Sequence, residues 1–240
     1  TVNGKIAMVN GQDFAVNGIA LSLGENTITA TMTDANGNTS STSITVYTNT
    51  QDAYVKLSST LESSLAPMST QLTLDTALPF AVTETLLSID GPSSSTPTPT
   101  TFPYTVTLDI PGIYLARVTV RTNDGYTYED KYALNVLDAT DMDTLLKAKW
   151  NGMKTRLVAG DVEGAVSFFE EGSQATYREQ FTALQPVLNL IANEMGQIYL
   201  VKIEDNSAEY EVITTRNGKI YSFHLLFVRN TNGLWKIKRF

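Results

Sequence analysis

One hydrophobic periodicity replaces another within residues 114–157, whose sequence is YLARVTVRTNDGYTYEDKYALNVLDATDMDTLLKAKWNGMKTRL. This change of period indicates which part of the chain is β and which begins with helices. In the first part of the stretch, apolar side chains recur at every second position, which predicts strands at 114–121 and 126–136. In its second part, they recur three and four residues apart, which predicts an amphipathic helix over 141–158. The change of period places a domain boundary near Leu137–Thr140.

Charge changes at the same boundary. Residues 1–138 carry five basic and thirteen acidic side chains, a net charge of −8, whereas residues 139–240 carry twelve of each. The acidic balance argues against nucleic acid as a partner, because phosphate binding needs a basic face. The chain has no cysteine, so neither disulfides nor thiolate metal sites stabilise it. No apolar run approaches the ~20 residues of a membrane span.

The acidic part divides again. Segments 28–33 and 43–47 alternate apolar with hydroxyl side chains, as strands with one buried face do. The polar run 48–52 is typical of a linker. We therefore expect a first module over residues 1–50 and a second over 51–138.

The second module contains a series of short strands. Its segment 92–103 holds four prolines among Ser and Thr, so we expect an extended surface loop without ladder bonds. Many short strands between turn signals predict a β-sandwich. The expected strands are 54–58, 71–74, 86–89, 104–108, 114–121 and 126–136.

Short motifs in residues 1–138 are similar to those of known modules. Gly24-Glu25-Asn26-Thr27-Ile28, Asp34-Ala35-Asn36-Gly37-Asn38 and Ile44-Thr45-Val46 resemble the closing half of a bacterial immunoglobulin-like repeat. Typical members have an earlier half before the equivalent of Val2-Asn3-Gly4, so this first module is expected to be partial. Through 104–108 and Pro111-Gly112-Ile113-Tyr114, the second resembles a polycystic-kidney-disease-type (PKD-like) immunoglobulin-like sandwich.

These resemblances imply a bacterial protein at the cell surface or secreted, with the periplasm as the alternative. They also imply a protein or a glycan as the partner.

Residues 139–240 predict an α+β domain with helices packed on a curved antiparallel sheet. Gly160 suits the end of the first helix, Asp161 can cap a second, and Ser173 is expected to start a third, with 170–196 helical throughout. Two-residue turn signals then separate the strands. These strands are 197–204, 208–216, 219–229 and 234–239.

The element order, with 157–165 and Gly233-Leu234-Trp235-Lys236-Ile237, resembles the cone-shaped fold of nuclear transport factor, ketosteroid isomerase and SnoaL-like relatives. That resemblance implies a ligand cavity. The family's hairpin between its second and third helices has no counterpart here, so we expect the cavity to be narrow or absent.

Five side chains are candidates to line such a cavity: His224, Tyr177, Tyr199, Tyr210 and Trp150. The only histidine, His224, could act as a general base there. A lone histidine partly buried at a sheet surface is the interpretation that we favour, and we predict no catalytic residue. Residues 139–240 leave the enzyme alternative open.

Asp34, Asn36 and Asn38 offer oxygen atoms at alternate positions, as a calcium loop does. No bidentate glutamate follows, so a structural turn is favoured, and we expect no cofactor.

Both faces of the strand 219–229 are apolar. One face must cover the helices, and the other needs a partner: a second copy, which would give a homodimer through the C-terminal sheet, the adjoining sandwich, or the concave side of a pocket. We favour a packing partner over a pocket. Tyrosines 104, 114, 126 and 128 could form a sugar-binding platform, although aromatic residues at period two usually lie in a sheet core.

We conclude from the sequence that this is a non-catalytic modular segment of an exported bacterial protein, with spacer or adhesive sandwiches and a C-terminal assembly or binding domain. The alternatives are a small-ligand-binding or isomerase-type enzyme domain of the cone fold, and a carbohydrate-binding accessory region of a larger enzyme.

Overall fold

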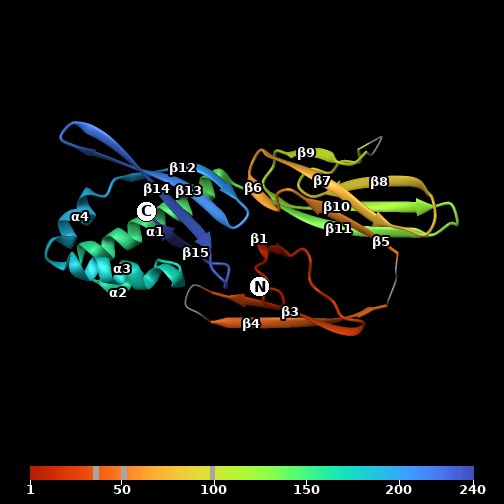
Figure 1. The fold of residues 1–240 in the computed structure, drawn as a ribbon, viewed down its shortest axis with the longest axis horizontal. Helices are drawn as coiled ribbons and strands as arrows, with labels where there is room; N and C mark the ends of the chain where they lie inside the picture. Colours follow the sequence, from red (N-terminus) through yellow and green to blue (C-terminus); the bar gives the residue numbers. More distant parts are fainter. Residues whose placement is uncertain (35–37, 50–52, 98–100) are drawn as a thin grey trace. The chain divides into compact units, whose positions relative to one another are not determined.

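The computed structural model describes residues 1–34, 38–49, 53–97 and 101–240. Strands account for 52% and helices for 21% of the described residues, which are therefore mainly β, with several sheets and a helical segment packed on a large sheet. It divides into two compact units, Thr1–Leu137 and Asp138–Phe240, and Figure 1 shows the elements of each. The division lies within the segment 137–140, where the sequence changes its period.

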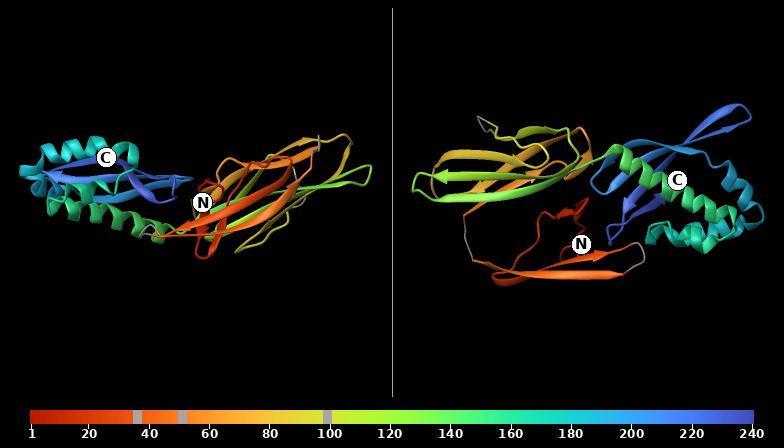
Figure 2. Two further views of the ribbon diagram at one scale, coloured as in Figure 1. Left: turned by 90° about the horizontal axis from the view of Figure 1, so that it is seen from below. Right: turned by 180° about the vertical axis from the view of Figure 1, so that it is seen from behind.

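Residues 53–137 form two sheets that lie face to face (Figures 1 and 2). Neighbouring strands are antiparallel, except that the short β6 runs parallel to β11. The first sheet has the order β5 (Tyr54–Ser59), β7 (Met68–Ala77), β9 (Tyr104–Leu108). The second has the order β6 (Ser63–Leu65), β11 (Thr127–Leu137), β10 (Gly112–Thr122), β8 (Val82–Asp90).

The sandwich core follows from the period-two pattern of these strands. Every second residue of β10 from Gly112 onward is buried, as expected where one face of a strand meets a second sheet. The buried side chains come from both sheets and form one cluster: Leu57, Met68, Leu72, Leu87, Ile89, Val106, Leu108, Tyr114, Ala116, Val118, Val120, Leu134 and Val136.

The proline-rich segment departs from the prediction at Ser95. Ser95 pairs with Ile89, its N–H donating to Ile89 O at 2.9 Å and its carbonyl accepting from Ile89 N at 2.8 Å. The expectation of no ladder bonds was therefore wrong at this residue, because a serine between prolines keeps the N–H that proline lacks.

Two hairpins precede the sandwich, β1 (Met8–Asn10) with β2 (Asp13–Ala15), and β3 (Gly24–Thr33) with β4 (Thr39–Thr48). β3 and β4 pair over ten consecutive residues without a bulge. The sequence predicted the β3–β4 hairpin and missed β1 and β2, whose three residues are too few to show a period.

The second unit begins with helices and ends in an antiparallel meander in chain order. In the described part of the chain, no helix combines the length and the hydropathy that crossing a bilayer requires. The helical elements are α1 (Ala139–Val158), α2 (Val162–Val166), α3 (Glu171–Ala183), the 3-10 turn η1 (Gln185–Val187) and α4 (Leu188–Glu194). The strands are β12 (Gln197–Glu204), β13 (Ser207–Arg216), β14 (Lys219–Arg229) and β15 (Trp235–Arg239).

Short-range signals explain where most helices begin and end. Gly160 has a φ of +72° after α1, and the carboxylate of Asp161 accepts from Gly164 N at 2.8 Å to cap α2. The third helix starts at Glu171, so the predicted start at Ser173 was wrong by two residues. The Ser173 hydroxyl donates to Lys238 O at 2.8 Å instead of capping its own helix.

The stretch 170–196 is not one continuous helix. It is interrupted at Leu184, after which Pro186 lies in the first positions of a 3-10 turn. Proline lacks the N–H that a continuous helix would need at this point.

Candidate functional site

Two of the five predicted cavity residues lie in the core of the C-terminal unit. Trp150 and Tyr210 are fully buried. Trp150 Nε1 donates to Gly196 O at 3.1 Å, and the Tyr210 hydroxyl donates to Asp143 Oδ1 at 3.2 Å. Burial, together with the neighbouring Asp143 carboxylate, raises the pKa of Tyr210 well above its ordinary value. Both polar groups therefore have a structural partner.

Tyr177 belongs to an aromatic cluster in the same unit. Its ring centroid lies 4.1 Å from that of Phe169 and 5.4 Å from that of Phe240, while Trp150 meets Phe240 edge-on at 5.1 Å. The Tyr177 hydroxyl accepts from Phe240 N at 3.0 Å. Phe181 also packs against Tyr177. The predicted cavity residues Trp150 and Tyr177 therefore lie among packed aromatic rings.

His224 and Tyr199 lie on the outer face of the sheet. They flank Glu211 in a row across β12, β13 and β14, and all three residues are exposed. The sequence predicted a partly buried histidine at a sheet surface; the His224 side chain lies on that surface and is 46% exposed.

An acidic partner of His224 comes from the adjacent strand. Its Nε2 lies 3.5 Å from Glu209 Oε2, and Glu209 also lies 3.6 Å from Lys202 Nζ. Glu209 was not among the predicted site residues. The two-residue turn Asn217-Gly218 is the sequence signal that could have placed Glu209 near His224. Such a turn pairs Arg216 with Lys219, and this pair determines the register of all the other pairs between β13 and β14.

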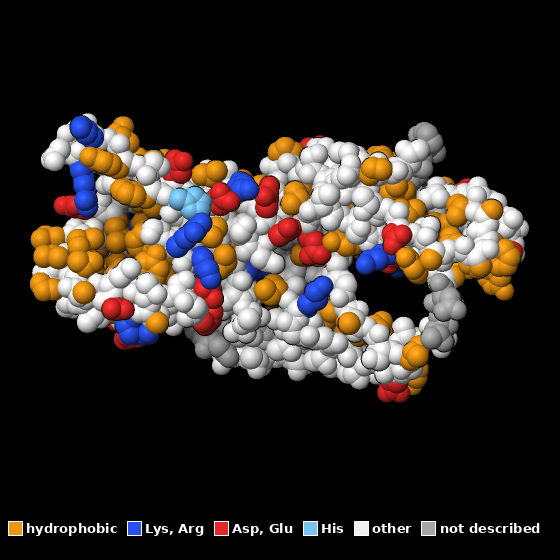
Figure 3. Space-filling view, in the orientation of Figure 1, with side chains coloured by type: hydrophobic (Ala, Val, Ile, Leu, Met, Phe, Trp, Pro, Cys, Tyr) orange, Lys and Arg blue, Asp and Glu red, His pale blue; other side chains and the backbone are white. Residues whose placement is uncertain are grey.

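The burial of apolar side chains changes along β14. Leu225 and Phe227 are fully buried, whereas Ile220, Tyr221 and Phe223, near the Asn217-Gly218 turn, are exposed. Apolar side chains in or next to η1 and α4 are exposed at the same end of the unit as Tyr221 and Phe223. Figure 3 shows apolar side chains gathered at this end. We call this group the distal apolar surface: Leu184, Val187, Leu190, Tyr221 and Phe223.

Polar contacts join the end of α4 to β13 beside the distal apolar surface. Thr214 Oγ1 donates to Glu194 O at 3.0 Å, and Arg216 forms a 2.8 Å ion pair with Glu194. These contacts join the end of α4 to β13, so helix and hairpin are held together by more than apolar packing.

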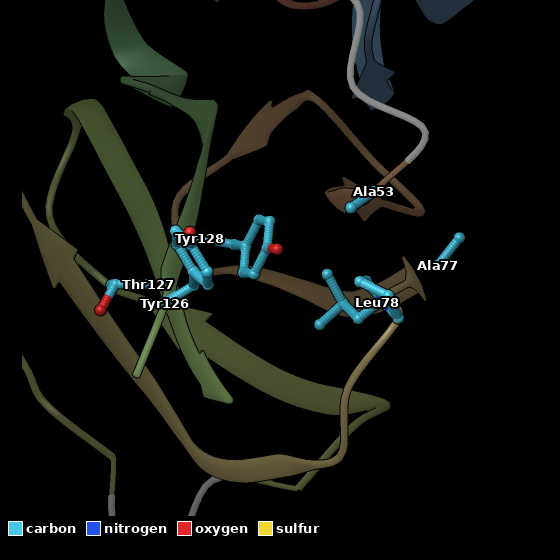
Figure 4. A pocket seen from close by; sticks show the side chains of 7 residues that line it. Ala53, Ala77, Leu78, Tyr126, Thr127 and Tyr128 are labelled. Carbon is cyan, nitrogen blue, oxygen red and sulfur yellow. The ribbon is translucent and has the colours of Figure 1, made fainter. Parts of the chain in front are cut away.

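A hollow of about 800 Å³ lies at one end of the sandwich. In Figure 4 the rings of Tyr126 and Tyr128 stand on one side of it, opposite Leu78 and Ala53. Tyr126 is 65% exposed. The remaining lining residues are Ala77, Pro79 and Thr127.

The four-tyrosine platform does not form. Tyr114 is fully buried and Tyr104 packs against the same core. Both lie on strands whose alternate residues point between the sheets, which leaves Tyr126 and Tyr128 as the tyrosines of the hollow.

In the weak calcium candidate, the carboxylate of Asp34 is hydrogen-bonded to Asn38. Asp34 accepts from Asn38 N at 2.9 Å and from Asn38 Nδ2 at 2.8 Å, an arrangement typical of a structural turn. Asn36 lies outside the described residues. The described ranges contain no cluster of three or more His, Cys, Asp or Glu side chains arranged to hold a metal ion.

Comparison with protein-family models and with curated proteins gave no match to this chain.

Proposed function

We propose that the chain is a non-catalytic modular segment of an exported bacterial protein, in which β-sandwiches act as spacers or adhesive modules and the C-terminal unit serves assembly or binding. The observation that carries this proposal is the strand order of residues 53–137. The order β5-β7-β9 facing β6-β11-β10-β8 matches an immunoglobulin-like sandwich, in which the chain crosses repeatedly between two sheets.

Tyr114 supports the same assignment. Its hydroxyl donates to Ile110 O at 3.0 Å, and Tyr114 lies near the start of β10, after the crossing from the other sheet. This arrangement resembles the tyrosine corner of immunoglobulin-like sandwiches and supports the proposal. Modules of this kind commonly occur in strings on cell surfaces, where their rigid cores separate binding sites.

The location can be tested on intact bacteria that express the native protein. Antibodies raised against this chain should label unpermeabilised cells or detect the protein in the medium. Labelling that required lysis, with none in the medium or periplasm, would contradict export.

The distal apolar surface supports the assembly role of the C-terminal unit. It exposes Leu190 and Phe223 by 60% and 52%, and exposed apolar groups of this kind favour contact with another apolar protein surface. The tight packing of Trp150 and Tyr177 favours this role over an isomerase-type cavity. Leu190→Ser and Phe223→Ser should abolish a protein contact made there without lowering stability, whereas unchanged association would contradict the role.

Carbohydrate binding is the second candidate, favoured by the hollow beside Tyr126 and Tyr128. An exposed tyrosine ring can stack on the apolar face of a sugar while its hydroxyl forms hydrogen bonds. On a glycan array, Tyr126→Ala should reduce binding roughly tenfold or more, as expected for loss of one good contact. Tyr47→Ala, at a tyrosine 73% exposed elsewhere, is the matched control. Equal losses in both variants would dismiss the hollow.

A further inference from the structure

The β3–β4 hairpin is an amphipathic sheet with one apolar face that is partly exposed. The paired residues Ile28 and Ile44 share that face, and the opposite face carries mostly Thr and Ser. Met32 and Ile44 are 70% and 62% exposed. The apolar face consists of Ile28, Ala30, Met32, Ile44 and Val46.

The two edges of this sheet differ. The outer edge of β3 is occupied: Thr31 N donates to Thr1 O at 2.8 Å, and Asn3 N donates to Thr29 O at 2.9 Å. Within the described residues, β4 pairs with β3 alone. The outer edge of β4 therefore presents unpaired backbone groups.

The register identifies those groups. In an antiparallel ladder, the N–H and C=O of one residue point to the same edge, and successive residues alternate. Because Thr29 and Thr31 point away from β4, Ala30 points toward it and pairs with Thr42. The residues of β4 whose N–H and C=O point to the open edge are then Ser41, Ser43, Thr45 and Tyr47.

The sequence does not protect this edge. Long edge strands usually carry a charge, a proline or a bulge that prevents pairing with other chains. Among the described strands of ten residues or more, β4 is the only one without a charged side chain. It also has no proline and no bulge against β3. At the sandwich edges, by contrast, β8 carries Glu84 and Asp90, and β9 has only five residues after Pro103.

We propose that β4 pairs antiparallel with β4 of a second copy of this chain, across a two-fold axis that places Ile44 opposite Ile44. In that register Thr42 faces Val46 and Ser43 faces Thr45, so apolar residues of both copies share one face. The outward N–H and C=O groups of each copy then bond to those of the other.

The outer edge of β4 is self-complementary about Ile44, which favours a second copy as the occupant. Residues 1–138 carry a net charge of −8, which repels another copy over most of this surface. The uncharged β4 is a strand along which two copies meet with no like charges opposite each other. The proposal rests on the hairpin alone and is independent of the proposed function.

The test is sedimentation of the chain over a concentration series, where we expect a monomer–dimer equilibrium. Thr45→Pro should weaken the dimer roughly 10-fold or more, because it removes an outward N–H from each copy. It leaves the N–H groups that bond β3 intact. Thr45→Val keeps the N–H and is the matched control, expected to dimerise as the parent does.

A second variant covers the case in which Thr45→Pro disturbs the hairpin. Ile44→Lys changes a side chain that is already 62% exposed and places two lysines opposite each other, so it should also yield a monomer. A chain that is monomeric at every concentration would overturn the proposal. So would a dimer that survives both changes and dissociates in Phe223→Ser, because that result moves the interface to the distal apolar surface.

Discussion

Strands β4 and β15 are both amphipathic, but their outer edges and apolar faces differ. In β15, Ile237 is fully buried, its N–H donates to Phe168 O at 2.9 Å, and its carbonyl accepts from Glu170 N at 2.9 Å. Lys236, Lys238 and Arg239 give β15 three positive charges in five residues. In β4, ten uncharged residues have one pairing partner, and Ile44 is mostly exposed.

The comparison shows that alternation alone does not determine what a strand does. Both strands have apolar residues on one face, yet β15 completes the core of its unit, whereas β4 leaves backbone donors and acceptors available. The structure of the surroundings, and the charges on the strand itself, distinguish a closed edge from an adhesive one.

Alanine variants of Ile237 and Ile44 should differ most in their effect on stability. Ile237→Ala should destabilise the C-terminal unit by about 3 kcal/mol, because it removes buried methylenes and leaves a cavity. Ile44→Ala should change the stability of the monomer by less than about 0.5 kcal/mol. Urea unfolding measures both, and Trp150 and Trp235 fluorescence reports on the C-terminal unit. Equal losses would show that β4 is covered in solution.

Two tyrosine hydroxyls provide a smaller test. Tyr114→Phe should lower the free energy of unfolding by about 1 kcal/mol, since a buried ring loses its hydrogen bond to Ile110 O. Tyr47 on β4 donates to Glu25 Oε2 at 2.6 Å but is 73% exposed. Tyr47→Phe should therefore leave the thermal midpoint unchanged. A greater loss in Tyr47→Phe than in Tyr114→Phe would show that the hydrogen bond from Tyr114 to Ile110 O is not the more stabilising contact.

The smallest effect concerns acid. A hydrogen bond from Lys238 of β15, with a second from Gly172 N, lowers the pKa of Glu170 below its ordinary 4.5. Because the folded pKa is the lower one, this stabilisation is complete above about pH 4.5 and is lost as the pH falls through the folded value. Lys238 is 44% exposed, so water screens the pair and its contribution stays below about 1 kcal/mol.

Glu170→Gln checks this contribution. The variant should be slightly less stable than the parent at pH 7, and the two should converge as the pH approaches 3. Parallel curves of unfolding free energy against pH would show that the contact with Lys238 contributes nothing in solution.

Several local features could be predicted from the sequence because each depends on a few neighbouring residues. Asn217 and Gly218 both adopt positive φ, as a two-residue hairpin turn requires, and Asp161 caps the helix that follows it. The short strands were missed for the opposite reason. β6 has three residues, and its pairing with β11 depends on backbone groups about 70 residues away.

The candidate site shows the same limit. Tyr177 and Tyr199 were both predicted as cavity residues, yet one packs against Phe169 and Phe240 and the other lies exposed beside Glu211. The ring contacts of Tyr177 join α3 to residues more than 60 positions later. No periodicity within one element reports such contacts.

The period of each long element, the hairpin turns, the helix caps and the charge imbalance around residue 138 could be predicted from the sequence, because they depend on nearest neighbours along the chain. The aromatic rings of the C-terminal core, the tyrosines of the hollow and the open strand edges follow from the tertiary structure alone. Those outcomes depend on side chains and backbone groups brought together from distant positions, whose burial and pairing no local pattern encodes.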